Sequence, residues 1–294
     1  MELRIIEAPI SVGSPTVGSE CAFRTLQAVG LPAAFDAHTV TWGPMERPAP
    51  SNRFPSNLKH LSEVQAVCRG VRSQVLEAVE AGIFPIIVGG DHSIGMGSIA
   101  ALGEHYGADS LSVVWIDGHT DINTDRSSPS GYIHGMPLAA AMGLCCSELQ
   151  MGQQKVNLKG SNTFILGARS IDPPEYPILR REGVNLYTAD RIGRDGLDAV
   201  LDDTLFRLRN RPIHVSLDVD CLDPTVFTAT GYVLEHGLLL PQVKAILRRL
   251  FRTGHVVSFE LVEYNPALDS DGHGLQVVLE LLTEVAEDLQ ERTR

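Results

Sequence analysis

The sequence lacks any apolar run long enough to cross a membrane. Although 44% of its 294 residues are hydrophobic, no stretch reaches the roughly 18 consecutive apolar residues that a spanning helix needs. Residues 1–6 also lack the long apolar core of a signal peptide. We therefore expect neither a membrane segment nor a secretory leader, and no membrane as a partner.

Basic residues are in the minority. The chain has 24 Lys and Arg against 36 Asp and Glu, a formal net charge of −12. Nucleic acids and anionic membranes bind positively charged surfaces, so this balance argues against either as the main partner. Part of the acidic excess lies in short aspartate clusters that follow apolar stretches.

Cysteines are few, odd in number and never spaced as a CxxC pair. The five are Cys21, Cys68, Cys145, Cys146 and Cys221. This usage predicts reduced thiols rather than a disulfide framework, and with it a cytoplasmic location.

Internal repeats, low-complexity tracts and breaks in composition are also absent. Short apolar runs at residues 84–88, 111–116 and 213–217 alternate with segments of helical spacing, such as 58–81 and 240–251. This alternation predicts one α/β domain over residues 1–294, with a mainly parallel sheet.

What stands out is a metal-type triplet after the apolar run 111–116. Asp117, His119 and Asp121 occupy alternate positions, and alternate side chains of an extended segment share one face. Two carboxylates and an imidazole on one face repel or stay unsatisfied unless a cation joins them. A hydrogen-bonded strand end is the alternative for this triplet taken alone.

Two further strand ends favour the metal reading. His92 follows the run 84–88, and Asp218 and Asp220 follow the run 213–217. Open α/β sheets place their sites at the carboxyl ends of strands, so we expect these side chains to converge. The candidate ligands are His92, Asp117, His119, Asp121, Asp218 and Asp220.

This ligand set predicts two divalent ions. Oxygen and imidazole donors without a thiolate favour Mn²⁺ over Zn²⁺, Co²⁺ or Fe²⁺. Four carboxylates balance two divalent cations, whereas one ion would leave a strongly anionic pocket. Two metals about 3.5–4 Å apart lower the pKa of a shared water and make a hydrolytic nucleophile without Ser or Cys.

The same stretches, together with SFELVEYNP at residues 258–266, resemble the signatures of the arginase (ureohydrolase) family, and the similarity covers nearly the whole chain. The resemblance implies a three-layer α/β/α sandwich with a binuclear manganese cluster. In it Asp117 and Asp218 bridge the ions, His92 and Asp121 complete one shell, and His119 and Asp220 the other. It also implies a homo-oligomer, a trimer or hexamer.

The resemblance further implies a hydrolysis in which a metal-bridging hydroxide attacks a guanidinium carbon. Glu263 binds the guanidinium, His134 shuttles the proton, and Asp121 completes the catalytic set. Asn123 and Ser130 match the arginase branch, where such side chains hold the α-carboxylate, and Asp172 matches the residue that meets the α-amino group. The small-molecule substrate so implied is L-arginine, cleaved to urea and L-ornithine.

Several positions depart from that branch. Tyr132 stands where a small polar residue is usual, and Tyr232 replaces a usual threonine. His236-Gly237 stands where a Gly-Gly pair is usual, with Glu235 just before it, and Asp125-Arg126 adds charge to the binding loop. We expect these departures at the pocket mouth, where they bear on substrate choice. The alternatives are another guanidino compound (agmatine, guanidinobutyrate or hydroxyarginine), an acetylated amine, or a catalytically silent ligand-binding relative.

Overall fold

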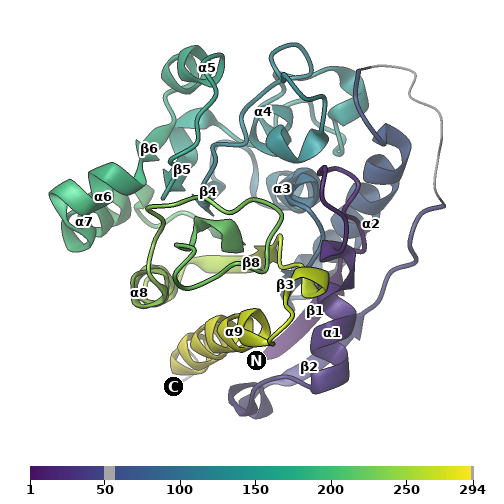
Figure 1. Ribbon diagram of the computed structural model, residues 1–294, viewed down its shortest axis with the longest axis vertical. Coiled ribbons are helices and arrows are strands. Elements are labelled where there is room, and N and C mark those ends of the chain that lie inside the picture. Colours follow the sequence, from purple (N-terminus) through teal and green to yellow (C-terminus); the bar gives the residue numbers. More distant parts are fainter. Residues whose placement is uncertain (50–56, 293–294) are drawn as a thin grey trace.

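The computed structural model describes residues 1–49 and 57–292. Its centre is one eight-stranded sheet in the order β2-β1-β3-β8-β7-β4-β5-β6 (Figure 1). Every neighbouring pair of strands is parallel, so the mainly parallel sheet expected from the sequence is confirmed. The strands are β1 (Glu2–Glu7), β2 (Thr39–Gly43), β3 (Phe84–Val88), β4 (Ser112–Ile116), β5 (Thr163–Leu166), β6 (Asn185–Tyr187), β7 (Ile213–Asp218) and β8 (Val256–Val262).

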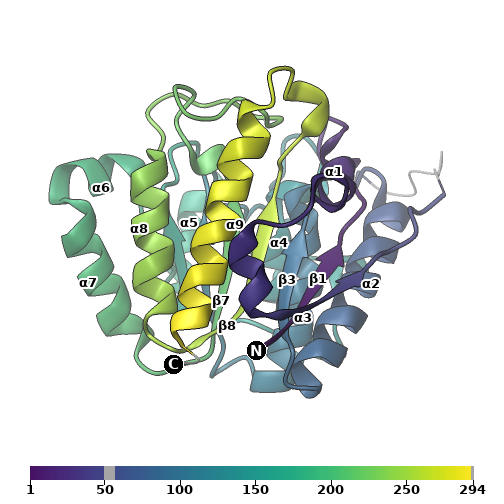
Figure 2. The same cartoon turned by 90° about the horizontal axis from the view of Figure 1, so that it is seen from below.

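Helices cover both faces of this sheet. They are α1 (Ala22–Val29), α2 (Leu61–Glu80), α3 (Gly95–Tyr106), α4 (Pro137–Ala141), α5 (Glu175–Glu182), α6 (Ala189–Asp195), α7 (Leu197–Leu208), α8 (Leu240–Phe251) and α9 (His273–Glu291). Side chains alternate between the faces along each strand. On β4, Val114 and Ile116 pack with α1, α7, α8 and α9, whereas Val113 and Trp115 pack with α2, α3 and α4. Figure 2 shows α8, α9 and α1 over one face, and the three-layer sandwich is confirmed.

Most helices lie where their spacing predicts them, with shifted ends. The helix expected from residue 58 begins at Leu61, because His60 has a left-handed backbone (φ 52°). Helix α6 is not apparent from the sequence, since Ile192 is its one buried residue and it offers no apolar stripe. Among the described helices, none is both long and apolar enough to span a bilayer.

The sheet order explains how the polar stretches meet. β3, β8, β7 and β4 are consecutive neighbours, and a parallel arrangement brings their carboxyl ends to one edge. The stretches with His92, Glu263, Asp218 and Asp117 come at the ends of these four strands. Residues far apart in sequence therefore lie side by side over the middle of the sheet.

Candidate metal centre and active site

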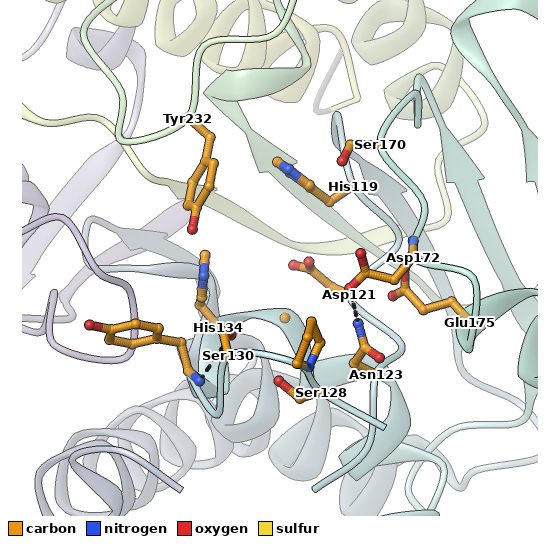
Figure 3. A pocket seen from close by; sticks show the side chains of 13 residues that line it. His119, Asp121, Asn123, Ser128, Ser130, His134, Ser170, Asp172, Glu175 and Tyr232 are labelled. Atoms are coloured by element: carbon orange, nitrogen blue, oxygen red, sulfur yellow. Dashed lines mark hydrogen bonds between the residues drawn. The ribbon is translucent and has the colours of Figure 1, made fainter. Parts of the chain in front are cut away.

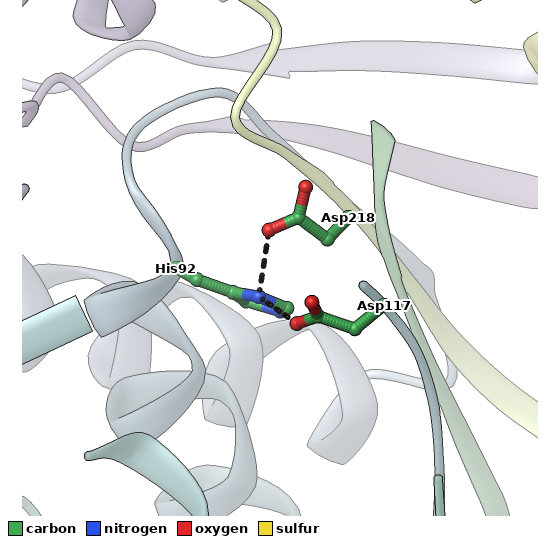
Figure 4. A group of neighbouring side chains, drawn as sticks. All are labelled: His92, Asp117 and Asp218. Carbon is green, nitrogen blue, oxygen red and sulfur yellow. Dashed lines mark ion pairs between the residues drawn. The ribbon is translucent and has the colours of Figure 1, made fainter. Parts of the chain in front are cut away.

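The structure brings His92 together with three carboxylates. Its Nδ1 atom lies 2.9 Å from Asp117 Oδ2, 3.1 Å from Asp218 Oδ2 and 3.2 Å from Asp121 Oδ2. Figure 4 shows Asp117 and Asp218 converging on the imidazole. The four side chains are almost completely buried, so no bulk water is available to solvate their charges.

A second group adjoins the first and shares Asp117 with it. His119 Nδ1 lies 3.0 Å from Asp220 Oδ2 and 3.5 Å from Asp117 Oδ1. Asp117 thus faces one group with each carboxylate oxygen, the arrangement that a bridging ligand needs. Asp218 faces the His92 group through Oδ2, while its Oδ1 accepts the backbone N–H of Asp220 at 2.7 Å.

The turns that deliver these side chains depend on unusual backbone geometry. Gly89 and Gly90 both have positive φ, and a Cβ on Gly90 would lie 2.5 Å from the carbonyl oxygen of Ala8. Only glycine tolerates that approach, so the pair carries the chain from β3 into the turn of His92. Asp121 (φ 46°) and Glu263 (φ 64°) also adopt the left-handed region, and such outliers concentrate at functional sites.

The titration behaviour of the cluster reflects its excess of negative charge. Burial and the nearby Asp117 charge raise the pKa of Asp121 to about 7. Burial and the neighbouring carboxylates likewise raise the pKa of Asp218. Burial would lower the pKa of His92, but the three carboxylates that face its imidazole outweigh burial and raise this pKa. Without a metal ion, protons on these side chains therefore offset part of the negative charge of the cluster.

A buried chain of hydrogen bonds sets the tautomer of His92. Burial alone would raise the pKa of Glu260, yet its contacts, His214 foremost, lower it, so the carboxylate is an acceptor. It accepts the hydroxyl proton of Ser216 at 2.8 Å. A serine hydroxyl has one proton, so Ser216 Oγ must accept from His92 Nε2 at 2.8 Å.

This direction leaves the lone pair of neutral His92 on Nδ1, which is buried and has no hydrogen-bond partner among residues 1–49 and 57–292. That lone pair points at three carboxylate oxygens, a repulsive arrangement that a bound cation reverses. Cys221 lies next to the cluster, but burial raises the pKa of its thiol and keeps it protonated. The donors are therefore imidazole nitrogens and carboxylate oxygens, which fit Mn²⁺ and related divalent ions.

His134 and Glu263 lie together beside the cluster. The Glu263 carboxylate is buried, its Oε1 accepts the backbone N–H of His92 at 3.0 Å, and the same oxygen lies 3.4 Å from His134 Nδ1. Burial would lower the pKa of His134, but the hydrogen bond and charge of Glu263 raise it. The imidazole can therefore carry a proton near neutral pH.

A pocket of about 220 Å³ opens above these groups (Figure 3). His119, Asp121 and His134 line it together with three residues expected to contact substrate, namely Asn123, Ser130 and Asp172. Asn123 Nδ2 donates to Asp172 Oδ2 at 2.8 Å, so these two side chains hold each other in place. No lysine or arginine from residues 1–49 or 57–292 lines the pocket.

The expected departures fall in different places. Tyr132 and Tyr232 do line the pocket, as do Ser128, Pro129, Gly135, Ser170 and Glu175. Glu235 and His236, which we expected at its mouth, are not among the described lining residues. Glu263 is not among them either, although its Oε1 lies 3.4 Å from Nδ1 of the lining residue His134.

Two positioning groups are not apparent from the sequence. Glu175 Oε1 accepts the N–H of Ile122 at 3.1 Å, and its Oε2 accepts that of Asp172 at 2.8 Å, which ties two lining segments together. Arg169 donates to five backbone carbonyls, those of Asp220, Cys221, Leu222, Leu234 and Glu235. Neither shows a pattern in the sequence, because the partners are distant segments or backbone atoms.

The sequence matches the family model described as "Arginase family" over residues 52–286. The chain belongs to the arginase family. It is 35% identical to an arginase of Bacillus caldovelox over 230 residues, which cover 77% of this chain and 76% of that protein. As a member of the family the chain is a hydrolase that acts on guanidino C–N bonds.

Solved structures of arginases superpose on nearly all of this family member. The Bacillus subtilis arginase has a TM-score of 0.89 at 32% identity, covering 97% of this chain and 98% of that one. The Entamoeba histolytica arginase in complex with L-ornithine also has a TM-score of 0.89, at 28% identity, covering 97% of each chain. The arginase-like fold expected from the motifs is thereby confirmed.

Proposed function

We propose that the protein hydrolyses L-arginine to urea and L-ornithine. The observation that carries the proposal is a single pocket lined both by metal-facing side chains and by a polar set for an α-amino acid. His119 and Asp121 supply the first, and Asn123, Ser130 and Asp172 the second. Arginases among the relatives, including one in complex with L-ornithine, support the same substrate.

Two Mn²⁺ ions per chain are the proposed cofactor. His92, Asp121, Asp117 and Asp218 would hold one ion, and His119 and Asp220, with the two shared aspartates, the other. The orphaned Nδ1 of His92 and the shared Asp117 support this assignment. When bound, two such ions neutralise the carboxylates and supply an acidified water as the nucleophile.

The chain's own residues bind and orient the guanidinium. Glu263 Oε1 is fixed by the His92 N–H and His134, and no hydrogen bond within the described residues uses Oε2. That free oxygen can accept from the guanidinium in a charge-assisted bond. Water adds to the guanidinium carbon, the bond from this carbon to the side-chain nitrogen of the substrate breaks, and urea and an amine leave.

His134 holds and moves the proton that this cleavage requires. The leaving nitrogen must be protonated as its bond to carbon breaks, and the Glu263 carboxylate, by raising the pKa of His134, favours the protonated imidazole that can donate this proton. Burial of the surrounding carboxylates excludes bulk water and strengthens these electrostatic contacts.

Agmatine is the second candidate substrate. The absence of any cationic side chain among the described lining residues, and the presence of Asp172 and Glu175, favour a ligand with an ammonium group and no carboxylate. 4-Guanidinobutyrate has no ammonium group for Asp172 to accept from, and a silent binding role would not need the complete ligand set. Hydroxyarginine keeps the α-substituents of L-arginine and is separated from it only by the assay.

The test is a hydrolysis assay on Mn²⁺-loaded protein with L-arginine, agmatine, 4-guanidinobutyrate and Nω-hydroxyarginine, with urea as the product measured for the first three and hydroxyurea for the last. We expect the highest kcat/KM with L-arginine and loss of urea release after chelation. A higher kcat/KM with agmatine would assign the second candidate, and no urea or hydroxyurea from any compound would reject hydrolysis of these guanidines.

By resemblance to the family we also propose a cytoplasmic homo-oligomer, a trimer or hexamer, whose whole chain forms one catalytic domain. The five free cysteines agree with a reducing compartment.

A further inference from the structure

Tyr232 reaches across the pocket from the segment between β7 and α8. Its ring lies nearly parallel to that of His134, with centroids 5.5 Å apart and an interplanar angle of 24°. The same ring meets His119 edge-on at 5.4 Å and 75°. One aromatic side chain therefore packs against both a candidate metal ligand and the candidate proton shuttle.

The backbone on both sides of Tyr232 is tied down. Ala229 O accepts from the N–H of Asn265 at 2.8 Å, two residues beyond Glu263. On the other side, Leu234 O and Glu235 O accept from Arg169 at 3.0 Å and 3.1 Å. Within three residues on each side of Tyr232, the backbone is thus hydrogen-bonded to the segments that carry Glu263 and Asp172.

The opposite side of the pocket is also fixed. Figure 3 shows Tyr232 and His134 facing Asp172, Glu175 and Asn123 across the space above Asp121. Those three polar side chains are joined by the Asn123–Asp172 hydrogen bond and the bond from the Asp172 N–H to Glu175. These contacts hold the backbone on both sides of the pocket, and the Tyr232 ring packs against His119 and His134 between them.

We propose that Tyr232 is a specificity-determining residue whose ring limits the metal-facing end of the pocket to a terminal guanidinium without further substituents. The choice of guanidinium as the ligand rests on the proposed function; the position of the ring does not. Guanidines with alkyl groups on the far nitrogens would collide with the ring or displace it from His119 and His134. A threonine at this position would leave that space open.

The size of the expected effect follows from steric selection in fixed pockets. One methyl or methylene group changes selectivity by roughly tenfold to a hundredfold when the walls do not move. A wall that could swing away would give a much smaller difference. The graded response to ligand width is therefore the quantity to measure.

The experiment measures binding of guanidinium, methylguanidinium and N,N′-dimethylguanidinium to Mn²⁺-loaded protein by calorimetry. Wild type, Tyr232→Phe and Tyr232→Thr are compared, with Tyr176→Thr as a control because that tyrosine is 55% exposed and lies outside the pocket. We expect affinity to fall at least tenfold from guanidinium to the dimethyl ion in wild type, Tyr232→Phe and the control. In Tyr232→Thr it should fall less than threefold.

The same fall in Tyr232→Thr as in wild type would overturn the proposal. So would a flat response in Tyr232→Phe, which would assign selectivity to the hydroxyl instead of the ring. If Tyr232→Thr does not fold, Tyr232→Ala carries the same expectation, with thermal unfolding and bound Mn²⁺ as checks of integrity.

A parallel urea assay separates this inference from the proposed function. If affinity falls with ligand width as expected but no guanidine releases urea, the proposed hydrolysis is rejected and the steric role of Tyr232 is still supported. Failure of wild type to bind any of the three cations would overturn both.

Discussion

We expect Asp172 to recognise the ammonium group of the substrate and not its carboxylate. Its carboxylate accepts from Asn123 at 2.8 Å, and its backbone N–H is held by Glu175 at 2.8 Å, so its position is set before substrate binds. No ion pair with a described residue neutralises it. Asp172→Asn keeps the size of the side chain and removes its charge.

The magnitude follows from losing a hydrogen bond between charged groups. Such a bond contributes about 1.5–3 kcal/mol, which corresponds to a fall in kcat/KM of roughly tenfold to a hundred-and-fiftyfold. The assay compares L-arginine with agmatine, which retains the amine and lacks the carboxylate, and with 5-guanidinopentanoate, which retains the carboxylate and lacks the amine. Asp172→Asn should impair the first two and spare the third.

Ser130→Ala provides the converse variant. Ser130 lines the same pocket, and its Oγ accepts from the N–H of Tyr132 at 3.3 Å, which leaves its own proton free for a carboxylate. This variant should impair L-arginine and 5-guanidinopentanoate and spare agmatine. Equal losses on all three substrates for both variants would refute the idea that Asp172 and Ser130 distinguish the α-substituents.

Three further predictions concern the metal site, pH and assembly. Ser216→Ala removes the acceptor of the His92 Nε2–H and should weaken Mn²⁺ binding about tenfold to a hundredfold, measured by metal titration; unchanged affinity would contradict the tautomer argument. Burial, and the Glu284 charge next, raise the pKa of Asp288 to about 6. Because ionising a buried aspartate with a raised pKa costs free energy, Asp288 destabilises the fold increasingly as the pH rises from about 4 through 6. Asp288→Asn should therefore add about 1–3 kcal/mol to the free energy of unfolding at pH 8 and almost none at pH 4. An equal gain at both pH values would contradict this prediction. Light scattering at micromolar concentration should show a trimer or hexamer; a monomer throughout the range would reject this.

The convergence of the six candidate ligands was predictable from the sequence. Asp117, His119 and Asp121 alternate after a buried strand, and two other strand ends carry the same donor types. A parallel sheet places those ends together, and the structure has five of the residues in two groups that share Asp117, with Asp121 3.2 Å from His92. Their roles as ligands stay predictions until metal is measured.

The support behind the ligands was not predictable. Ser216 and Glu260 meet because they are register partners on β7 and β8, and strand register is a property of the folded sheet. The Arg169 contacts involve backbone carbonyls, which leave no trace in residue types. Glu235 and His236, expected at the pocket mouth, are not among the described lining residues, and that expectation stays a prediction.

The proposed chemistry depends on a two-ion site in which Asp117 belongs to both ligand groups. It is tested most directly by counting Mn²⁺ bound per chain after saturation and removal of free metal. We predict two equivalents for wild type, about one for His119→Asn, and essentially none for Asp117→Asn. One equivalent in wild type at saturating Mn²⁺ would contradict the account.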